Sequence, residues 1–106
     1  MQWRGAMLDI SRHYFDKEFI KKTLSALAIF DYNVLHLHLT DDQGWRLESK
    51  RYPLLHEVGS RRARSQNNHG LLPTTFDNTE HSGYLTHDDV REIVAHAHSL
   101  GILKPL

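Results

Sequence analysis

Two adjacent carboxylates, Asp41 and Asp42, follow a segment whose alternating side chains are typical of a β-strand. The segment reads VLHLHL over residues 34–39, and the residues after it read TDDQGW. Adjacent aspartates at a strand end can form a catalytic pair, bind a metal ion, or only cap a turn. The spacing alone leaves these three interpretations open.

His36 and His38 provide a second chemical possibility, because side chains two apart on a strand point to the same side. With carboxylates at the strand end, such a pair could bind a metal ion, as in barrel metallohydrolases. Against this, no distant strand offers further ligands, and the pair lies several residues before the strand ends. We interpret both as packed histidines of a barrel interior, expect no metal and no cofactor, and assign the remaining histidines to surface or capping positions.

These side chains depend on strands that the hydrophobic pattern predicts. Along residues 34–39, one face carries Leu35, Leu37 and Leu39, and the other carries Val34, His36 and His38. A shorter apolar segment, Ala6–Ser11, is followed by the charged residues Arg12 and His13, as a barrel strand opening into a loop would be. We predict a strand in each place.

Helical periodicity appears twice, each time after a capping signal. Asp16 is the predicted N-cap of the first helix, and Thr86 with Asp89 has capping-box spacing before the second. The recurring apolar positions are Ile20, Leu24, Leu27 and Ala28 in the first helix, and Val90, Ile93, Val94 and Ala97 in the second. Gly101 is placed to end the second helix, and residues 102–106 would begin a third strand.

The part of the chain between these helices is less regular. Residues 46–49, RLES, could form a short added strand, and residues 52–59, YPLLHEVG, a short helical turn. Residues 65–83 are predicted to be a long polar connection. No composition shift marks a domain boundary.

The order strand, helix, strand, loop, helix, strand is the β/α alternation that predicts a parallel sheet. We therefore assign the α/β class and expect an incomplete (β/α)₈ TIM barrel, with about the first three strands and two helices. A closed barrel needs roughly 250 residues, whereas this sequence has 106. Residues 1–106 are expected to form a single partial domain.

Composition narrows the partners. Lys plus Arg equals Asp plus Glu at 13 each, so no broad positive field is present and nucleic acid is not an expected partner. Arg61, Arg62 and Arg64 are assigned to a solvated loop, because three charges are fewer than a basic patch motif has. The sequence has no Cys, which excludes disulfides and thiol chemistry. Charged residues interrupt residues 1–15, so no membrane partner is expected, and the compartment stays open.

Three segments together resemble one known family. They read WRGAMLDISRHYF from Trp3, NVLHLHLTDDQGWRLESKRYPLL from Asn33 and GYLTHDDVREIVAHAHSLGI from Gly83. In this order they closely resemble the start of the catalytic barrel of family 20 glycoside hydrolases, the β-N-acetylhexosaminidases. The resemblance covers nearly the whole chain and rests on motifs far longer than a metal or phosphate motif. It implies hydrolysis of terminal N-acetylhexosamines from a carbohydrate substrate.

The resemblance also implies roles for particular residues. Arg4 matches an arginine that binds sugar hydroxyls in the substrate pocket, where a guanidinium can donate to two adjacent oxygens. Asp41 matches an aspartate that supports a histidine beside the general acid, fixing the imidazole tautomer and tuning the pKa of the acid. Asp42 is the alternative to Asp41, because neighbouring positions are easily exchanged.

Other residues that match the family are assigned structural roles. Asp9, Arg12 and His13 are expected to tie the first strand to the base of the pocket. Trp45 could stack on a sugar face or hold the loop in place, and we leave it out of the predicted site.

The mechanism that the resemblance implies is retaining and substrate-assisted, so the 2-acetamido oxygen of the sugar attacks the anomeric carbon. An aspartate orients that amide, and a neighbouring glutamate protonates the leaving oxygen. In the family these form an Asp-Glu pair after a His-x-Gly-Gly stretch, and the supported histidine lies in a Pro-Gly-His stretch. None of these motifs occurs in the sequence. We therefore expect an N-terminal piece of a barrel that is inactive without the missing C-terminal half.

Two other functions stay open: a metal-dependent barrel hydrolase that uses His36 and His38, and a sugar-binding module without catalysis. The isolated chain is also expected to be aggregation-prone or molten. Barrel strands are covered on both faces, so a partial barrel would leave Val34, His36 and His38 facing solvent and strand edges unpaired.

Overall fold

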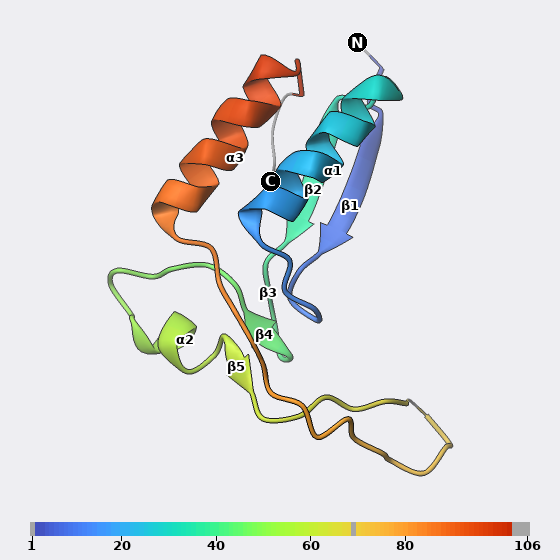
Figure 1. The fold of residues 1–106 in the computed structure, drawn as a ribbon, viewed down its shortest axis with the longest axis vertical. Coiled ribbons are helices and arrows are strands. Elements are labelled where there is room, and N and C mark those ends of the chain that lie inside the picture. The colour runs from blue at the N-terminus through green and yellow to red at the C-terminus, as the bar shows by residue number, and fades with distance from the viewer. Residues whose placement is uncertain (1, 69, 103–106) are drawn as a thin grey trace.

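The computed structural model describes residues 2–68 and 70–102 (Figure 1). Along the chain, the elements are β1 (Gly5–Asp9), α1 (Lys17–Ile29), β2 (Val34–His38), β3 (Thr40–Asp41), β4 (Gly44–Trp45), α2 (Leu54–Glu57), β5 (Arg61–Arg62), β6 (His81–Ser82) and α3 (His87–Ser99). They divide into two regions. The β/α layer contains β1, α1, β2 and α3, and the loop region, residues 40–83, contains the others.

β1 and β2 form a parallel pair, with Gly5 opposite Val34 and Asp9 opposite His38. The two strands predicted from the sequence are confirmed, although β1 ends before Ser11 and β2 ends at His38. Parallel pairing brings both carboxyl ends to the same edge, so the polar residues that follow the two strands are neighbours.

The two faces of β2 differ in burial. Its leucines belong to the hydrophobic core, whereas His36 on the other face is exposed. The expectation that Val34 faces solvent was wrong, since it is only 6% exposed. Asn33 ties the residues before β1 to this end of β2, because its side-chain oxygen accepts from the Arg4 amide at 2.9 Å. The residues before β1 are thereby held beside Val34.

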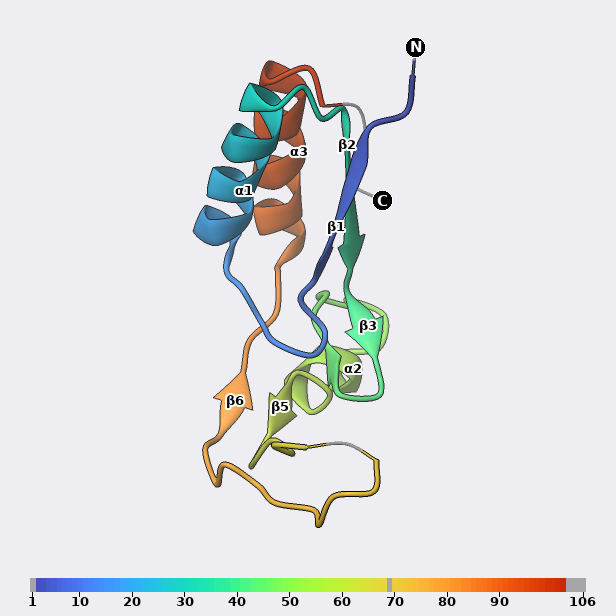
Figure 2. The same ribbon diagram turned by 90° about the vertical axis from the view of Figure 1, so that its right-hand side faces the viewer.

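α1 and α3 lie side by side on one face of the β1–β2 pair (Figure 2). The predicted caps of both helices are confirmed. The Asp16 side chain accepts from the Phe19 amide at the start of α1, and Thr86 and Asp89 form a reciprocal capping box at the start of α3. Gly101 follows α3 with a φ of +75°, a left-handed conformation that glycine adopts without steric cost.

Buried aliphatic side chains join the helices to the strands. α1 contributes Ile20 and Leu24, α3 contributes Ile93 and Ala97, and β2 contributes Leu35. Burying one Leu or Ile side chain stabilises a fold by about 1.5–3 kcal/mol relative to leaving it exposed. The apolar periodicity of the sequence is therefore the main source of stability in the β/α layer.

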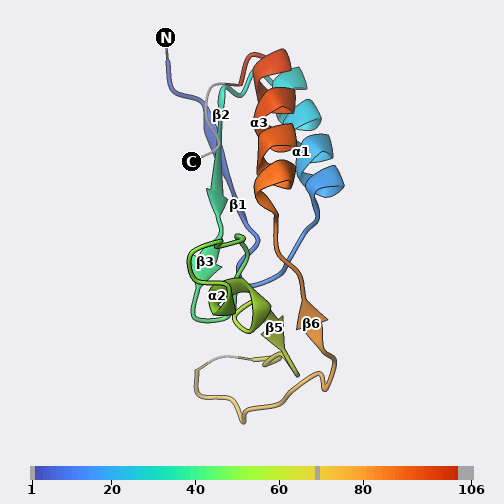
Figure 3. The ribbon, with the colours of Figure 1, turned by 90° about the vertical axis from the view of Figure 1, so that its left-hand side faces the viewer.

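The loop region extends beyond the carboxyl ends of β1 and β2 (Figure 3). β3 pairs with β4 and β5 with β6, both antiparallel, and α2 confirms the predicted helical turn. The strand proposed for residues 46–49 is reduced to one bridge between Leu47 and Leu85. The predicted polar connection is folded back on itself, with β6 at its end and a bridge between Gln66 and Phe76 further out.

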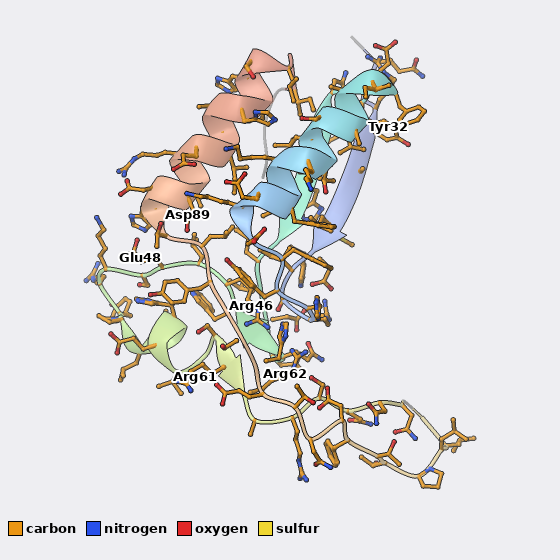
Figure 4. The ribbon with its side chains drawn as sticks, in the orientation of Figure 1. Tyr32, Arg46, Glu48, Arg61, Arg62 and Asp89 are labelled. Carbon is orange, nitrogen blue, oxygen red and sulfur yellow. The ribbon has the colours of Figure 1, made fainter. Side chains whose placement is uncertain are left out.

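Arg46, which is 1% exposed, is the centre of the hydrogen bonds that hold the loop region (Figure 4). Its Nε donates to the Ile10 carbonyl at 3.0 Å, and its Nη2 to the Ser11 carbonyl at 3.0 Å. Its Nη1 donates to the Ser60 carbonyl at 2.6 Å and to the Gly83 carbonyl at 3.1 Å. Burial lowers the pKa of Arg46, but a guanidinium stays protonated and its fixed fork of donors suits several carbonyls.

The chain after α3 completes the described part. Ile102 is fully buried, while residues 103–106, on which most of the predicted third strand falls, lie outside the described residues. No helix in the part that the structure describes is long and apolar enough to cross a membrane.

Candidate functional site

Four polar side chains meet where β1 and β2 end: Asp9, Arg12, His38 and Asp41, here called the strand-end cluster. Asp9 fixes the turn after β1, because its Oδ1 accepts from the amides of Ser11 at 2.9 Å and Arg12 at 3.1 Å. Its Oδ2 pairs with Nη1 of Arg12 at 2.9 Å. Burial opposes ionisation, but these hydrogen bonds outweigh it and lower the pKa of Asp9.

Asp41 uses both of its carboxylate oxygens, one for the adjacent backbone and one for other side chains of the cluster. Its Oδ1 accepts from the Asp42 amide at 2.8 Å. Its Oδ2 lies 2.8 Å from Nε2 of His38 and 2.9 Å from Nη2 of Arg12. The Asp42 amide first, then His38 and Arg12, lower the pKa of Asp41 to about 2. Asp41 is therefore an anion at every physiological pH.

The contacts of His38 favour one tautomer. Nε2 also lies 3.1 Å from Nη1 of Arg12, and a single ring nitrogen cannot both accept from Arg12 and donate to Asp41. A nitrogen without a proton would place its lone pair against the Asp41 carboxylate. Donation from Nε2 to Asp41 is the shorter and charge-assisted contact, so the proton belongs on Nε2. In the described structure, the imidazole whose tautomer Asp41 sets is therefore that of His38.

The structure separates the two predicted carboxylates. Asp41 has its side chain in the strand-end cluster, whereas Asp42 contributes its backbone amide and carries an exposed side chain. Asp9 and Arg12, to which the sequence assigned a structural role, close the turn after β1, and Arg12 also reaches Asp41. This last contact could not be predicted from the sequence, because it joins the turn after β1 to β3.

Arg4 is not part of this cluster. It precedes β1, at the amino-terminal edge of the parallel pair, whereas the cluster lies at the carboxyl edge. Its Nε donates to the carbonyl of Asp31 at 2.5 Å, and its Nη1 to that of Gln2 at 3.2 Å. The two residues predicted as site residues, Arg4 and Asp41, therefore lie at opposite ends of the strands.

The histidines are used in different ways. His36 is exposed, and among residues 2–68 and 70–102 no group of three or more His, Asp or Glu side chains is placed to hold a metal ion. The assignment of the other histidines to surface or capping positions was wrong for His56, which is 8% exposed. Its Nδ1 accepts from the Ser49 amide at 3.1 Å, so it braces the segment before α2.

A hollow of about 800 Å³ lies on one side of Asp42, here called the apolar hollow. Trp45, Tyr52, Leu54 and Val58 line it. The indole nitrogen of Trp45 donates to the carbonyl of Leu47 at 2.7 Å, so this side chain also holds the loop in place. A second hollow, of about 670 Å³, lies between Arg12 and residues of the β5–β6 segment, and Asp42 lines both.

Comparison with known proteins places this geometry in context. The sequence model of the glycosyl hydrolase family 20 catalytic domain matches residues 1–103. A β-hexosaminidase of Porphyromonas gingivalis is 45% identical over 95 residues, which cover 90% of this chain and 11% of that protein. The N,N′-diacetylchitobiase of Vibrio harveyi is 42% identical over 106 residues, covering 94% of this chain and 12% of that protein. The chain thus spans a small part of these curated relatives.

Solved structures give the same picture. The crystal structure of a β-N-acetylhexosaminidase superimposes with a TM-score of 0.83 at 40% identity, covering 94% of this chain and 19% of that one. The family 20 exo-β-N-acetylglucosaminidase of Vibrio harveyi in complex with N-acetylglucosamine gives 0.81 at 36% identity, covering 94% and 15%. The similarity therefore extends over both sequence and three-dimensional arrangement.

Proposed function

Because the chain belongs to glycosyl hydrolase family 20, a TIM-barrel family, we propose that it forms the first strands and helices of a β-N-acetylhexosaminidase barrel. Residues 1–106 are then an N-terminal segment of one catalytic domain, which further β/α units complete. The names of the relatives support hydrolysis of terminal non-reducing N-acetyl-D-hexosamine residues. The proposed reaction is retaining and substrate-assisted and uses no cofactor.

The position of the strand-end cluster is the observation that carries this proposal. Barrel enzymes place their reacting groups at the carboxyl ends of the parallel strands. Asp9 and His38 are paired at that end of β1 and β2, and Arg12 and Asp41 join them there. The exposed face of β2 at His36 is the face that a closed barrel would turn inward.

Asp41 is proposed as a positioning carboxylate. A general acid must hold its proton at the working pH, and a group with a pKa of about 2 does not. Its anionic oxygens instead fix the protonated nitrogen of an imidazole and the guanidinium of Arg12. This fits support of a histidine next to the general acid, which a later part of the barrel would provide.

Arg4 is proposed as a substrate-binding residue on the family resemblance alone. Its bond to the Asp31 carbonyl points it away from the strand-end cluster, so binding a sugar requires the side chain to leave Asp31 and turn into the barrel. Arg12 already lies at the carboxyl edge. Replacing each arginine by alanine and comparing KM decides between them. Loss of the arginine that binds sugar hydroxyls should raise KM more than it lowers kcat.

The proposal is tested in a hybrid enzyme, in which residues 2–102 replace the matching segment of the Vibrio harveyi exo-β-N-acetylglucosaminidase. We expect the hybrid enzyme to hydrolyse 4-nitrophenyl N-acetyl-β-glucosaminide. Asp41→Asn should lower kcat/KM by about tenfold or more, the factor that corresponds to about 1.4 kcal/mol. Asp42→Asn is the matched control and should change it less than about twofold, because its exposed carboxylate forms no ion pair with Arg12 or His38 within the described residues.

Two results would contradict the proposal. One is a hybrid enzyme that unfolds as cooperatively as its parent but gives no turnover. The other is equal loss of activity in the Asp41 and Asp42 variants, which would remove the assignment to Asp41. Bound zinc in the purified hybrid, lost on replacing His36, would instead favour the metal-dependent hydrolase.

A further inference from the structure

The second hollow beside Asp42, here called the arginine hollow, is lined by guanidinium groups. Its lining includes Arg12, Arg61, Arg62 and Arg64, against the single carboxylate of Asp42. Three of these arginines come from the β5–β6 segment and one from the strand-end cluster. The hollow therefore brings cations from distant parts of the chain together.

Arg61 and Arg64 are exposed, as the predicted solvated loop requires, and Arg62 is half-buried. Specific contacts nevertheless hold Arg62 and Arg64 in place. Nε of Arg62 donates to Oγ of Ser65 at 2.7 Å, and its Nη1 to the Gln43 carbonyl at 3.4 Å. The Arg64 guanidinium lies over the Phe76 ring, 3.9 Å from its centroid. Stacking on an aromatic face and a fixed hydrogen bond both reduce the entropy that a guanidinium loses when it binds an anion.

Apart from Asp42 in the lining, the acidic residues around the hollow already pair with arginines. Glu80 pairs with Arg61 at 2.8 Å, and Asp9 and Asp41 pair with Arg12 at 2.9 Å each. Within residues 2–68 and 70–102, neither Arg62 nor Arg64 lies within ion-pair distance of a carboxylate. Their remaining N–H groups are donors without an anionic acceptor.

Asp77, the acidic residue nearest in sequence to Phe76, is bound to the backbone. Its Oδ1 accepts from the amides of Ser65 at 2.8 Å and Thr79 at 3.0 Å, which holds the two sides of the β5–β6 segment together. This carboxylate therefore holds Ser65, which lines the hollow, and is not itself part of the lining.

Size and position indicate the ligand. At about 670 Å³ the hollow lies within the range of about 300–1,000 Å³ that small-molecule sites occupy, and it holds a sugar ring with ease. Arg12 belongs both to its lining and to the strand-end cluster. An anion bound by Arg62 and Arg64 would thus lie next to the proposed catalytic edge, as part of the same substrate.

We propose that the arginine hollow binds an oxyanion, a carboxylate or a sulfate ester, carried by the sugar to which the cleaved N-acetylhexosamine is linked. This inference rests on the proposed function. Guanidinium forks match the geometry of both oxyanions and give hydrogen bonds about twice as strong as neutral ones. The hollow therefore selects acidic glycans among substrates that share the same terminal sugar.

The test uses matched disaccharides and the hybrid enzyme. N-acetylglucosaminyl-β-1,4-glucuronate and N-acetylglucosaminyl-β-1,4-(6-O-sulfo)glucose are compared with the neutral N-acetylglucosaminyl-β-1,4-glucose at low ionic strength. We expect kcat/KM to be about tenfold higher for an acidic substrate, as one charge-assisted hydrogen bond would give. The preference should decrease as salt is added. A preference for either acid supports the site and identifies its ligand.

Charge-neutral variants locate the effect. The double replacement Arg62→Gln and Arg64→Gln should remove the preference while leaving cleavage of the neutral disaccharide within about twofold. The matched control replaces Arg51 and Arg91, which removes the same charge away from the hollow and should keep the preference. If the double variant does not fold, Arg62→Lys takes its place as a milder variant. It keeps the charge but loses the guanidinium fork, and it should reduce the preference.

The outcomes separate the two proposals. A hybrid enzyme that cleaves all three disaccharides equally well overturns the oxyanion site and leaves the proposed function standing. A folded hybrid enzyme that cleaves none of them overturns the proposed function itself. A preference that survives the double replacement, or disappears equally in the control, also overturns the assignment to Arg62 and Arg64.

Discussion

The β/α layer and the loop region are stabilised in different ways. In the β/α layer, helices α1 and α3 bury aliphatic side chains against β1 and β2, and many residues share the stabilisation. In the loop region, short strands depend on one buried cation, Arg46, which binds carbonyls of three separate segments. The site lies where the two regions meet, so its geometry depends on both. A substitution in the β/α layer should therefore remove only part of the stabilisation of that layer, whereas replacing Arg46 should weaken the whole loop region.

Replacing Arg46 by methionine should have the largest effect. Methionine fills much of the space but leaves the carbonyls of Ile10, Ser11 and Gly83 without their donor, at about 1–3 kcal/mol for each one that stays buried. The Ser60 carbonyl loses one donor and keeps the Gly83 amide. Hydrogen exchange of the hybrid enzyme should show that the free energy of opening the loop region falls by about 3–5 kcal/mol.

Arg46→Lys is the control for charge. An ammonium has three donors and no fork, so it should restore only part of the protection. Exchange in α1 should stay slow in both variants. Equal loss of protection in α1 and in the loop region would show that the two regions open as one.

Ile93→Ala probes the β/α layer in the same assay. Ile93 lies on α3, belongs to the hydrophobic core and is 1% exposed. Truncating its side chain to alanine should lower the free energy of unfolding by about 2–4 kcal/mol. Protection should fall in α1 and α3 and change little in β5 and β6. Ile29 provides the control, because it is 80% exposed and its replacement by alanine should change stability by less than about 0.5 kcal/mol.

Thr86→Ala should have a smaller effect, confined to the start of α3. The Thr86 hydroxyl accepts from the Asp89 amide at 3.1 Å, and the Asp89 carboxylate accepts from the Thr86 amide at 2.9 Å. Losing one half of this capping box costs about 1 kcal/mol. Thr23→Ala, inside α1, is the control and should be neutral or slightly stabilising, since alanine favours helix. A larger loss in the control would contradict the capping argument.

The sequence predicted the β/α layer well, because its signals are local. Alternation over residues 34–39, the N-cap at Asp16 and the capping box at Thr86 each depend on residues close in sequence, and all were confirmed. The loop region was predicted poorly. Arg46 binds carbonyls up to 37 residues away, and no periodicity reports such contacts.

The candidate site shows the same division. Asp41 was predicted from its position after a strand and from the family resemblance, and its role stays a prediction, to which the structure adds the partners that hold the side chain. Arg12 was assigned only a structural role because its contact with Asp41 joins two segments that are distant in sequence, the turn after β1 and β3. Arg62 and Arg64 were assigned to a solvated loop, and Arg64 is indeed exposed. Its stacking on Phe76 was missed, since that contact depends on a fold-back that the sequence does not reveal.

The smallest expected effect concerns pH, and it involves the joint between the two regions. Nε2 of His81 accepts from the Tyr14 amide at 2.8 Å, and its ring stacks on that of His13 with centroids 4.4 Å apart. Burial, then the nearby charge of Arg62, lowers the pKa of His81 below its usual 6.5. Protonation of Nε2 would remove the acceptor that Tyr14 needs.

The sign follows from the lowered pKa of His81. The unfolded chain takes up a proton as the pH falls through about 6.5 before the folded chain does, so stability is full above that pH and declines below it. Between pH 7 and 5, hydrogen exchange at Tyr14 should therefore speed up relative to α1. Asp41, with its pKa of about 2, stays ionised throughout and does not contribute. His81→Gln offers an uncharged acceptor and should flatten the profile, whereas His98→Gln, on exposed α3 surface, should not. An unchanged profile in His81→Gln would assign the pH dependence to another group.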